Sequence, residues 1–274
     1  MNALEISARS SANVAVEVVE ETGSTNADLL ARASSLEAPL LLVARNQTAG
    51  RGRAGRSWLS SSEGSLTFSL AWRFDGGVNR LAGLPLAVGV ALAETLDRLG
   101  VQVALKWPND VLRDGAKLAG ILIETRNETR NETTNETRNG TQTAQTAPGG
   151  AVWAVIGIGL NLIMPDELEA QIGRSVASLP WLARMDRNEL LAALLDGLAG
   201  ALHEFERAGF AAFAARWNLR HAWQGETVTI LDRGAVLHEG VAAGVDDAGR
   251  LLLDTAEGRI AVLAGDVSLR VKGA

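Results

Sequence analysis

The chain has 274 residues, of which 47% are hydrophobic, so it is long enough and apolar enough for a large core and a small second domain. It contains no cysteine, which excludes disulfides, thiol nucleophiles and thiolate metal sites. Its formal net charge of −6 argues against a broad nucleic-acid surface, because phosphate binding requires a basic face, and any anion site must therefore be a local basic cluster.

The first half of the chain predicts strands and helices around one core. Ser24-Thr25-Asn26 follows a glycine and supplies the N-cap of a helix that runs to Leu36. Over residues 66–74, apolar side chains take every second position, which is the period of a half-buried strand. A second helix, over residues 81–99, ends at Gly100, where a left-handed residue is favoured. Further strands are predicted over residues 14–20, 39–45, 103–107, 117–124 and 152–162.

A repetitive segment over residues 126–150 separates the last two of these strands. Arg-Asn-Glu-Thr recurs there with a period of four, before a tract of Thr, Gln, Ala, Pro and Gly, and this composition predicts a disordered hairpin loop. Its Asn-x-Thr triplets match glycosylation acceptors, but residues 1–11 do not resemble a secretory signal. No apolar stretch approaches the roughly 20 residues of a membrane span, so we expect a cytoplasmic protein.

The C-terminal part predicts helices followed by a small β-domain. A capping box at Asp186 and Glu189 opens a long helix, and a shorter helix follows it. From Gly225 onward, short strands broken by turns are typical of a small β-barrel. We therefore expect a larger domain over residues 1–222 and a barrel domain over residues 223–274.

A basic, glycine-rich segment is the most informative motif. Residues 50–56 contain three arginines and three glycines within seven positions. Glycines let the backbone approach a ligand, and guanidinium groups bind carboxylate and phosphate through paired donors. The segment indicates a site for a polyanion, although by itself it fits a solvated turn or an Arg-Gly segment that binds nucleic acid equally well.

Two further motifs lie at the ends of predicted strands. Lys106-Trp107-Pro108-Asn109-Asp110 ends one strand and residues 117–124 begin the next, which implies a hairpin with Lys117 at the mouth of a sheet and Gly120 open to a ligand. In residues 156–161, two glycines share one strand face and leave an open slot. The alternatives are exposed strand-end lysines and a simple β-bulge.

The order of these motifs resembles that of the biotin protein ligase family. The matching segments are residues 24–26, 50–56, 106–110, 117–124 and 157–161. The resemblance implies an α+β fold, with a mixed β-sheet flanked by helices as in class II aminoacyl-tRNA synthetases and a small C-terminal SH3-like β-barrel. It also implies that the protein makes biotinyl-5′-adenylate from biotin and ATP, and then transfers biotin to the lysine of a biotin carboxyl carrier protein.

Site residues follow from the same resemblance. It implies that Lys117, Arg53 and Arg51 are catalytic, with Lys117 as the main cation, and that the Arg-Gly loop orders over the ligand as a lid. The residues expected to bind biotin are Ser24, Thr25, Asn26, Gln47, Gly50, Arg51, Lys117, Gly120, Gly157 and Gly159. The residues expected to bind the nucleotide are Arg51, Arg53, Arg56, Trp58, Lys106, Asn109, Asp110, Asn161 and Arg270.

Magnesium is the one metal that we expect. Mg²⁺ should bridge the phosphates of ATP, without an assigned protein ligand, and the three histidines are too scattered to predict zinc. Some family members begin with a winged helix-turn-helix, but the first predicted strand starts near residue 14, so we expect no DNA binding. A monomer or a homodimer is equally compatible with the sequence.

Several assignments stay open at this stage. Trp58 and Trp107 lie within matched motifs, yet large aromatic residues are more often core anchors. Residues 175–179 lack the aromatic side chain that covers adenine in some relatives, and Trp181 is a possible substitute. Two other functions are possible: a lipoate-protein ligase or octanoyl transferase of the same fold, whose arginine and triple-glycine motif is missing here, and an RNA-binding module built on residues 51–56.

Overall fold

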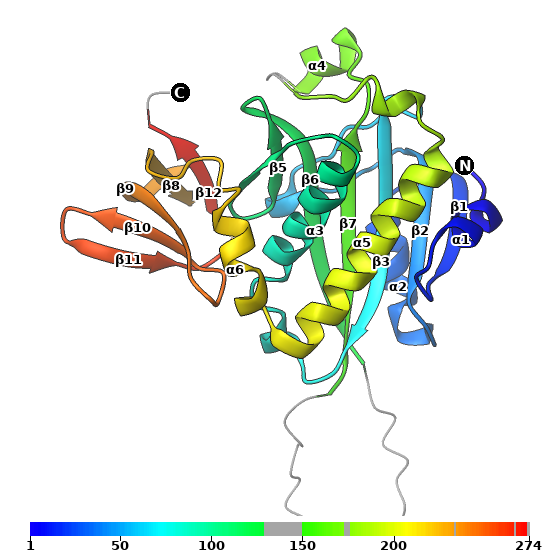
Figure 1. The fold of residues 1–274 in the computed structure, drawn as a ribbon, viewed down its shortest axis with the longest axis horizontal. Helices are drawn as coiled ribbons and strands as arrows, with labels where there is room; N and C mark the ends of the chain where they lie inside the picture. Colours follow the sequence, from blue (N-terminus) through cyan, green and yellow to red (C-terminus); the bar gives the residue numbers. More distant parts are fainter. Residues whose placement is uncertain (129–149, 173–175, 233, 266, 273–274) are drawn as a thin grey trace, which may run out of the picture.

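The computed structural model describes residues 1–128, 150–172, 176–232, 234–265 and 267–272, as a large mixed sheet with helices and a smaller antiparallel sheet (Figure 1). Most of the predicted loop over residues 126–150 lies outside the described residues. The expected fold, a helix-flanked mixed sheet with a small C-terminal β-domain, is confirmed.

The large sheet has seven strands in the order β1-β2-β3-β7-β6-β5-β4. Only β1 and β2 pair in parallel, and every other pair in the sheet is antiparallel, which makes the sheet mixed. Its strands are β1 (Ala15–Thr22), β2 (Leu40–Gln47), β3 (Ser65–Phe74), β4 (Ala104–Lys106), β5 (Asp110–Arg113), β6 (Ala116–Asn127) and β7 (Val152–Asn161).

Strand β5 corrects the predicted hairpin. The sequence motifs suggested one turn between the strand ending at Asp110 and the strand beginning at Lys117. Instead, the chain reverses within four residues, Asp110 pairs with Lys106, and β5 then pairs with β6. The extra strand was missed because its four residues are too few to show a period.

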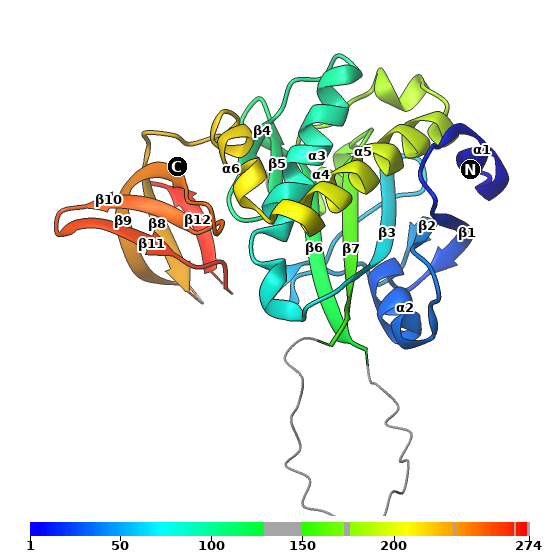
Figure 2. The same cartoon turned by 60° about the horizontal axis from the view of Figure 1, so that its bottom comes forward.

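Strand β3 is buried on both faces, although its alternating pattern predicted a half-buried strand. The large alternating side chains, such as Phe68 and Trp72, face the main core beneath α3 and α5. The positions between them hold small residues, Ser65, Thr67 and Ser69, which are also buried. Helix α2 packs over this second face of the sheet (Figure 2), so a strand that alternates large with small side chains is covered on both sides.

The helices largely follow the predicted pattern, with different ends. Helix α2 stops at Arg32, before a short 3₁₀ turn, and α3 begins at Leu84, because Gly83 before it has φ 80° and Phe210 packs against it. Gly100 ends α3 with φ 78°, as predicted. The helices are α1 (Ala3–Arg9), α2 (Thr25–Arg32), α3 (Leu84–Arg98), α4 (Asp166–Ile172), α5 (Arg187–Ala208) and α6 (Ala211–Asn218), of which α1 and α4 were not predicted.

The C-terminal sheet has five antiparallel strands in the order β11-β10-β9-β8-β12. They are β8 (Thr227–Asp232), β9 (Ala235–Val245), β10 (Leu251–Thr255), β11 (Gly258–Val262) and β12 (Val267–Val271). This barrel lies beside α6 and strands β4 and β5 (Figures 1 and 2). Trp107 is fully buried and its indole N–H donates to the carbonyl of Gly249 at 3.2 Å, so it anchors the barrel to the large domain.

No helix in the described parts of the chain is long and apolar enough to cross a membrane.

Candidate active site

One cleft brings together residues that are far apart in the sequence. It lies between the large sheet, the loop of residues 50–58 and strand β12, and is partly open to solvent. The predicted site residues that line it are Ser24, Thr25, Asn26, Gln47, Arg51, Arg53, Arg56, Trp58, Lys106, Asn109, Asp110, Lys117, Gly120, Gly157, Gly159 and Arg270.

Two predicted site residues do not line this cleft. Asn161 is buried, and its amide donates to the carbonyl of Lys117 at 3.4 Å, which supports the backbone beside the site. Gly50 lies at the base of the loop, where a Cβ would be 2.4 Å from the carbonyl oxygen of Trp58. Both residues therefore shape the walls of the cleft from outside it.

A chain of neutral hydrogen bonds forms one end of the cleft. Ser24 caps α2, and the next two residues reach the neighbouring strands. The backbone N–H and the hydroxyl of Thr25 donate to Oε1 of Gln47 at 2.8 and 3.1 Å. The hydroxyl oxygens of Thr25 and Ser69 are 2.7 Å apart, and Ser69 donates to Oδ1 of Asn26 at 2.7 Å. These side chains are buried, except for the half-buried Gln47, and hold one another, so this end is preorganised for a neutral polar ligand.

Two residues of this network were missed by the sequence analysis. Ser69 lies on β3 among the small buried positions, and Glu124 accepts from Nδ2 of Asn26 at 2.9 Å. The signal that could have identified Ser69 is the run Ser65-x-Thr67-x-Ser69, since hydroxyls on every second position of an otherwise apolar strand are unusual on a buried face.

The predicted slot over the paired glycines is already filled. A Cβ on Gly159 would lie 2.2 Å from a ring carbon of Trp58, and one on Gly157 would lie 2.3 Å from Oδ1 of Asn26. The indole also lies against Gly120, where a Cβ would be 3.2 Å from it. The absence of side chains on these strands therefore makes room for Trp58 and Asn26, and the expectation of an open slot was wrong.

The Arg-Gly loop is a short hairpin-like loop that forms a second wall. Arg51 and Ser57 form an antiparallel bridge, and the N–H of Trp58 donates to the carbonyl of Gly50 at 2.9 Å. At its tip, Ala54 and Gly55 have φ values of 54° and 70°, in the left-handed region. These contacts fix the backbone of the loop, so the starting points of the arginine side chains are also fixed.

The arginines of this loop contact different parts of the cleft. Nη1 of Arg51 is 3.4 Å from Oε1 of Glu124, at the end that contains Asn26. Arg53 reaches the opposite end, where it donates to Oδ1 of Asn109 at 3.0 Å and to the carbonyl of Gly265 in the barrel. One loop thus connects both ends of the cleft and the second domain.

Two lysines face a single carboxylate at this opposite end. Nζ of Lys117 is 2.5 Å from Oδ1 of Asp110, and Nζ of Lys106 is 3.6 Å from Oδ2. Their side chains are only 11% (Lys106) and 20% (Lys117) exposed, so they are not the solvated strand-end charges considered as an alternative. Lys117 also lies over the indole of Trp58, 5.6 Å from its centroid.

The pKa of Lys106 is lowered to about 8, mainly by burial; Asp110 acts in the opposite direction, and the charges of Arg270 and Lys117 add smaller decreases. Six basic side chains line the cleft, whereas Asp110 is its one carboxylate among the described residues. This excess of positive charge in an acidic protein is suited to a polyanionic ligand.

Trp181, considered as a cover for adenine, does not line the cleft. It is 46% exposed and packs against the guanidinium of Arg113, 4.3 Å from its ring centroid. The first residue of the stretch 175–179, which lacks the aromatic cover, lies outside the described residues. No group of three or more histidine or acidic side chains that could hold a metal ion occurs in the described part of the chain.

Comparison with known proteins gives two family matches. The biotin/lipoate A/B protein ligase family matches residues 16–136, and the biotin protein ligase C terminal domain matches residues 225–270. The chain is 34% identical over 263 residues to the bifunctional ligase/repressor BirA of Escherichia coli, covering 93% of this chain and 74% of that protein. It is also 34% identical over 261 residues to the biotin–[acetyl-CoA-carboxylase] ligase of Mycobacterium tuberculosis, covering 92% and 88%.

Solved structures show the same similarity in three dimensions. The biotin protein ligase from Aquifex aeolicus in complex with biotin and ATP superposes with a TM-score of 0.70 at 27% identity, over 94% of this chain and 99% of that one. A single-substitution mutant of the same Aquifex aeolicus ligase, in complex with biotin, gives a TM-score of 0.71 at 28% identity, over 94% and 98%.

Proposed function

Because the chain belongs to the biotin protein ligase family, we propose that its cleft holds biotin at the neutral end and ATP at the basic end, and joins them there. The protein is an ATP-dependent biotin protein ligase, which forms biotinyl-5′-adenylate and then transfers biotin to a lysine. The observation that carries the site assignment is the convergence of Arg51, Arg53 and Lys117, from two separate stretches of sequence, on one cleft.

The ureido head of biotin is neutral and carries both donors and acceptors. Thr25, Asn26, Gln47 and Ser69 offer both kinds of group on side chains that already fix one another. We place the ureido head against this network. The apolar ring system and tail of biotin would then lie along Gly157 and the indole of Trp58. This indole, which lies over Gly159, either moves away when biotin binds or forms one wall of the channel for the tail.

The nucleotide fits the opposite end, where Arg53, Lys106, Lys117 and Arg270 supply positive charge. Cations fixed at this end offset the charge of the triphosphate before the reaction begins. Asp110, the one carboxylate among the described lining residues, pairs with two lysines, so magnesium would enter with ATP and not on a protein ligand, and would offset part of the phosphate charge.

The first step brings two anions together. A carboxylate oxygen of biotin attacks the α-phosphorus of ATP, the bond to the bridging oxygen breaks, and pyrophosphate leaves. Negative charge grows on the oxygens around the α-phosphorus during this step. Lys117 lies at the basic end, beside Trp58 and Asp110, and is the cation placed to stabilise that charge.

In the second step, the amine of the acceptor lysine attacks the acyl carbon, AMP leaves, and the nitrogen loses a proton. The mixed anhydride must be protected from water until then. The Arg-Gly loop can serve as the lid, because Arg53 ties it to Asn109 and to the barrel carbonyl of Gly265 across the basic end.

The acceptor is inferred from the relatives. Two of them carry the name biotin–[acetyl-CoA-carboxylase] ligase, which describes a carboxylase as their substrate. We assign a biotin carboxyl carrier protein as the acceptor of this enzyme too. The same relatives decide between the two ligase functions, since their names specify biotin and not lipoate.

The direct test is incubation of the enzyme with biotin, Mg-ATP and a purified biotin carboxyl carrier domain, followed by intact mass measurement. We expect the mass of one biotinyl group to be added to the carrier, and no addition to a carrier whose acceptor lysine is replaced by arginine. Labelling with lipoate in place of biotin, or no labelling with either acid, would contradict the proposed function.

A further inference from the structure

The barrel completes the basic end of the cleft. The end of β12 contributes Leu269 and Arg270 to the lining, and the carbonyl of Gly265, just before this strand, accepts from Arg53. The shape of this end therefore depends on where the barrel sits relative to the large domain.

A side-chain amide on α6 holds the barrel in place. Oδ1 of Asn218 accepts from the N–H of Val245 at 2.8 Å, and Nδ2 donates to the carbonyl of the same residue at 3.1 Å. On its other side, Val245 pairs with Leu251 of β10. The amide thus occupies the place of a further strand at the end of β9, because it satisfies the donor and the acceptor of one residue as a neighbouring strand does.

The backbone of the barrel is adapted to this contact. Gly244 has φ 102°, and a Cβ there would lie 2.7 Å from Oδ1 of Asn218. A glycine is needed at this position for its conformation and for the close approach of the amide.

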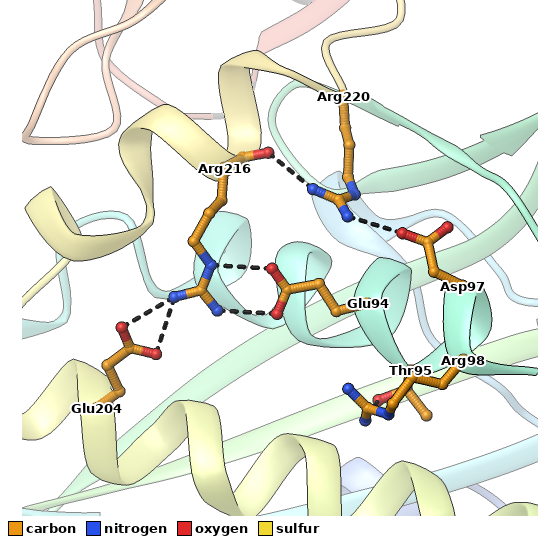
Figure 3. Close-up of polar contacts among 7 residues, drawn as sticks. All are labelled: Glu94, Thr95, Asp97, Arg98, Glu204, Arg216 and Arg220. Atoms are coloured by element: carbon orange, nitrogen blue, oxygen red, sulfur yellow. Dashed lines mark hydrogen bonds and ion pairs between the residues drawn. The ribbon is translucent and has the colours of Figure 1, made fainter.

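Helix α6, which carries Asn218, is itself fixed to the large domain (Figure 3). Two residues earlier, Arg216 makes paired hydrogen bonds of 2.9 Å to Glu94 on α3 and two more of 2.9 Å to Glu204 on α5. Two residues later, Arg220 donates to Asp97 at 2.7 Å. The amide of Asn218 therefore lies at the end of a helix that is fixed to α3 and α5. Its hydrogen bonds hold the barrel at a defined place relative to these two helices.

A second attachment lies close to this contact. The indole of Trp107 donates to the carbonyl of Gly249, a few residues beyond Val245, and Gly249 packs against Gly83. Without the amide of Asn218, the barrel would stay attached through Trp107, through the hydrogen bond from Arg53 to Gly265 and through the chain, but a hydrogen-bonded contact near the β9–β10 turn would be lost.

From this geometry we infer that Asn218 is a positioning residue for the nucleotide end of the active site. By clamping β9 to α6, it sets the place of Arg270 and of the carbonyl that holds Arg53. The biotin end is built entirely by the large domain and does not depend on the clamp. This inference rests on the proposed function for the location of ATP.

The test uses the full chain and measures biotin-dependent exchange of pyrophosphate into ATP. In Asn218→Ala we expect the KM for ATP to rise roughly tenfold, because small displacements of positioning groups have large kinetic costs, while the KM for biotin stays within about twofold. The matched control is Asn188→Ala, since the amide of Asn188 also joins two elements, accepting from the N–H of Asn2 and donating to Glu5, far from the barrel. It should change neither KM.

A second variant approaches the clamp from the barrel. Gly244→Ala should raise the KM for ATP as Asn218→Ala does, and its effect should be smaller in the Asn218→Ala background, where the oxygen that the methyl group meets is gone. If Asn218→Ala does not fold, Asn218→Asp keeps the shape and the acceptor but loses the donor, and the same rise in the KM for ATP is expected.

The inference is overturned if the folded Asn218 variants leave the KM for ATP unchanged, or if both KM values rise by the same factor. Absence of biotin-dependent exchange in the unaltered enzyme would be a different result. It would refute the proposed function itself, so exchange by the unaltered enzyme is measured before any variant is compared.

Discussion

The two ends of the cleft are built in different ways. The end assigned to biotin consists mainly of neutral side chains from α2, β2 and β3, which hydrogen-bond one another within a single domain, with Glu124 of β6 accepting from Asn26 at its edge. The end assigned to the nucleotide gathers charged groups from the Arg-Gly loop, the β4–β5 hairpin and the barrel, and pairs them with few counter-charges.

This difference matches what each end has to do. A neutral ligand is recognised by dipoles whose positions are fixed before it arrives, because unpaired buried donors and acceptors are costly. A polyphosphate is recognised by charge, and cations can be contributed by several mobile or separately docked elements. The first end therefore depends on local packing, whereas the second depends on how loop, hairpin and barrel are brought together.

The largest effect should come from the lysine that lies beside Trp58 and Asp110 at the basic end. Lys117→Ala removes the group aimed at the growing charge, and we expect the rate of adenylate formation to fall on the order of a hundredfold or more. Single-turnover measurement of adenylate formation checks this. Lys272→Ala is the matched control, since Lys272 pairs with Glu239 on the surface of the barrel, and an equal loss in both variants would contradict the assignment.

The next prediction concerns the link between the ends. Arg53→Gly removes the hydrogen bonds that join the loop to Asn109 and to the barrel. The adenylate should therefore escape and label bystander lysines. Mass spectrometry of a reaction with added serum albumin measures this labelling. A variant that labels only its carrier protein would show that the loop does not act as the lid.

The neutral end can be perturbed through its glycines. In Gly159→Ala the new methyl group would lie 2.2 Å from a ring carbon of Trp58, and overpacking of this kind costs about 1–3 kcal/mol. We expect the KM for biotin to rise by about tenfold or more and the KM for ATP to change less. Gly200→Ala is the control, because nothing lies within 4 Å of a Cβ there, and a similar rise in both variants would contradict this account.

A smaller change removes one hydroxyl of the same network. Ser69→Ala deprives Oδ1 of Asn26 of its donor and Thr25 of a neighbour, at a cost of about 1 kcal/mol. The KM for biotin should rise severalfold and the KM for ATP should not change, as measured by titrating each substrate in the exchange assay. Equal changes in both constants would mean that the two ends are not separate.

The smallest expected effect is a dependence on pH at the charged end. Because the pKa of Lys106 is lowered to about 8 by burial, its ammonium is charged at pH 7 and largely neutral at pH 9. The groups that face it are Asp110, Lys117, Arg270 and the ring of Trp223. The KM for ATP should rise by a few fold between these pH values, the equivalent of about 1 kcal/mol of ion pairing.

Lys106→Met checks the origin of this dependence, since it removes the titrating group and should make the KM for ATP flat over the same range. The folded state also binds fewer protons than the unfolded chain between pH 8 and the ordinary value of 10.5. The free energy of unfolding should accordingly increase with pH over that window, and this increase should be absent from Lys106→Met. A KM for ATP that rises equally in both proteins would assign the effect to another group.

The sequence predicts the charged end better than the neutral end. Arg51, Arg53 and Lys117 stand out because clustered arginines and glycines are rare in an acidic chain, and the motifs place them in one cleft. Ser69 does not stand out, because a serine in a strand has no distinctive spacing and its role depends on helix α2 covering that face.

Packing also explains where the prediction failed. The glycines at 157 and 159 correctly indicated missing side chains, but only the fold shows that Trp58 and Asn26 enter the space they leave. Strand β5 and helices α1 and α4 are too short to show a period, whereas the long elements β3, α3 and α5 were identified from their patterns. Asn218 has no motif at all, since its partner is backbone of a distant strand.

The most direct test of the central claim, that one cleft joins a neutral biotin end to a basic nucleotide end, is the exchange of labelled pyrophosphate into ATP by the unaltered enzyme with no carrier present. The account predicts exchange that requires biotin, is not supported by lipoate, and falls on the order of a hundredfold or more in Lys117→Ala. Exchange that proceeds without biotin, or that is unaffected by loss of Lys117, would contradict it.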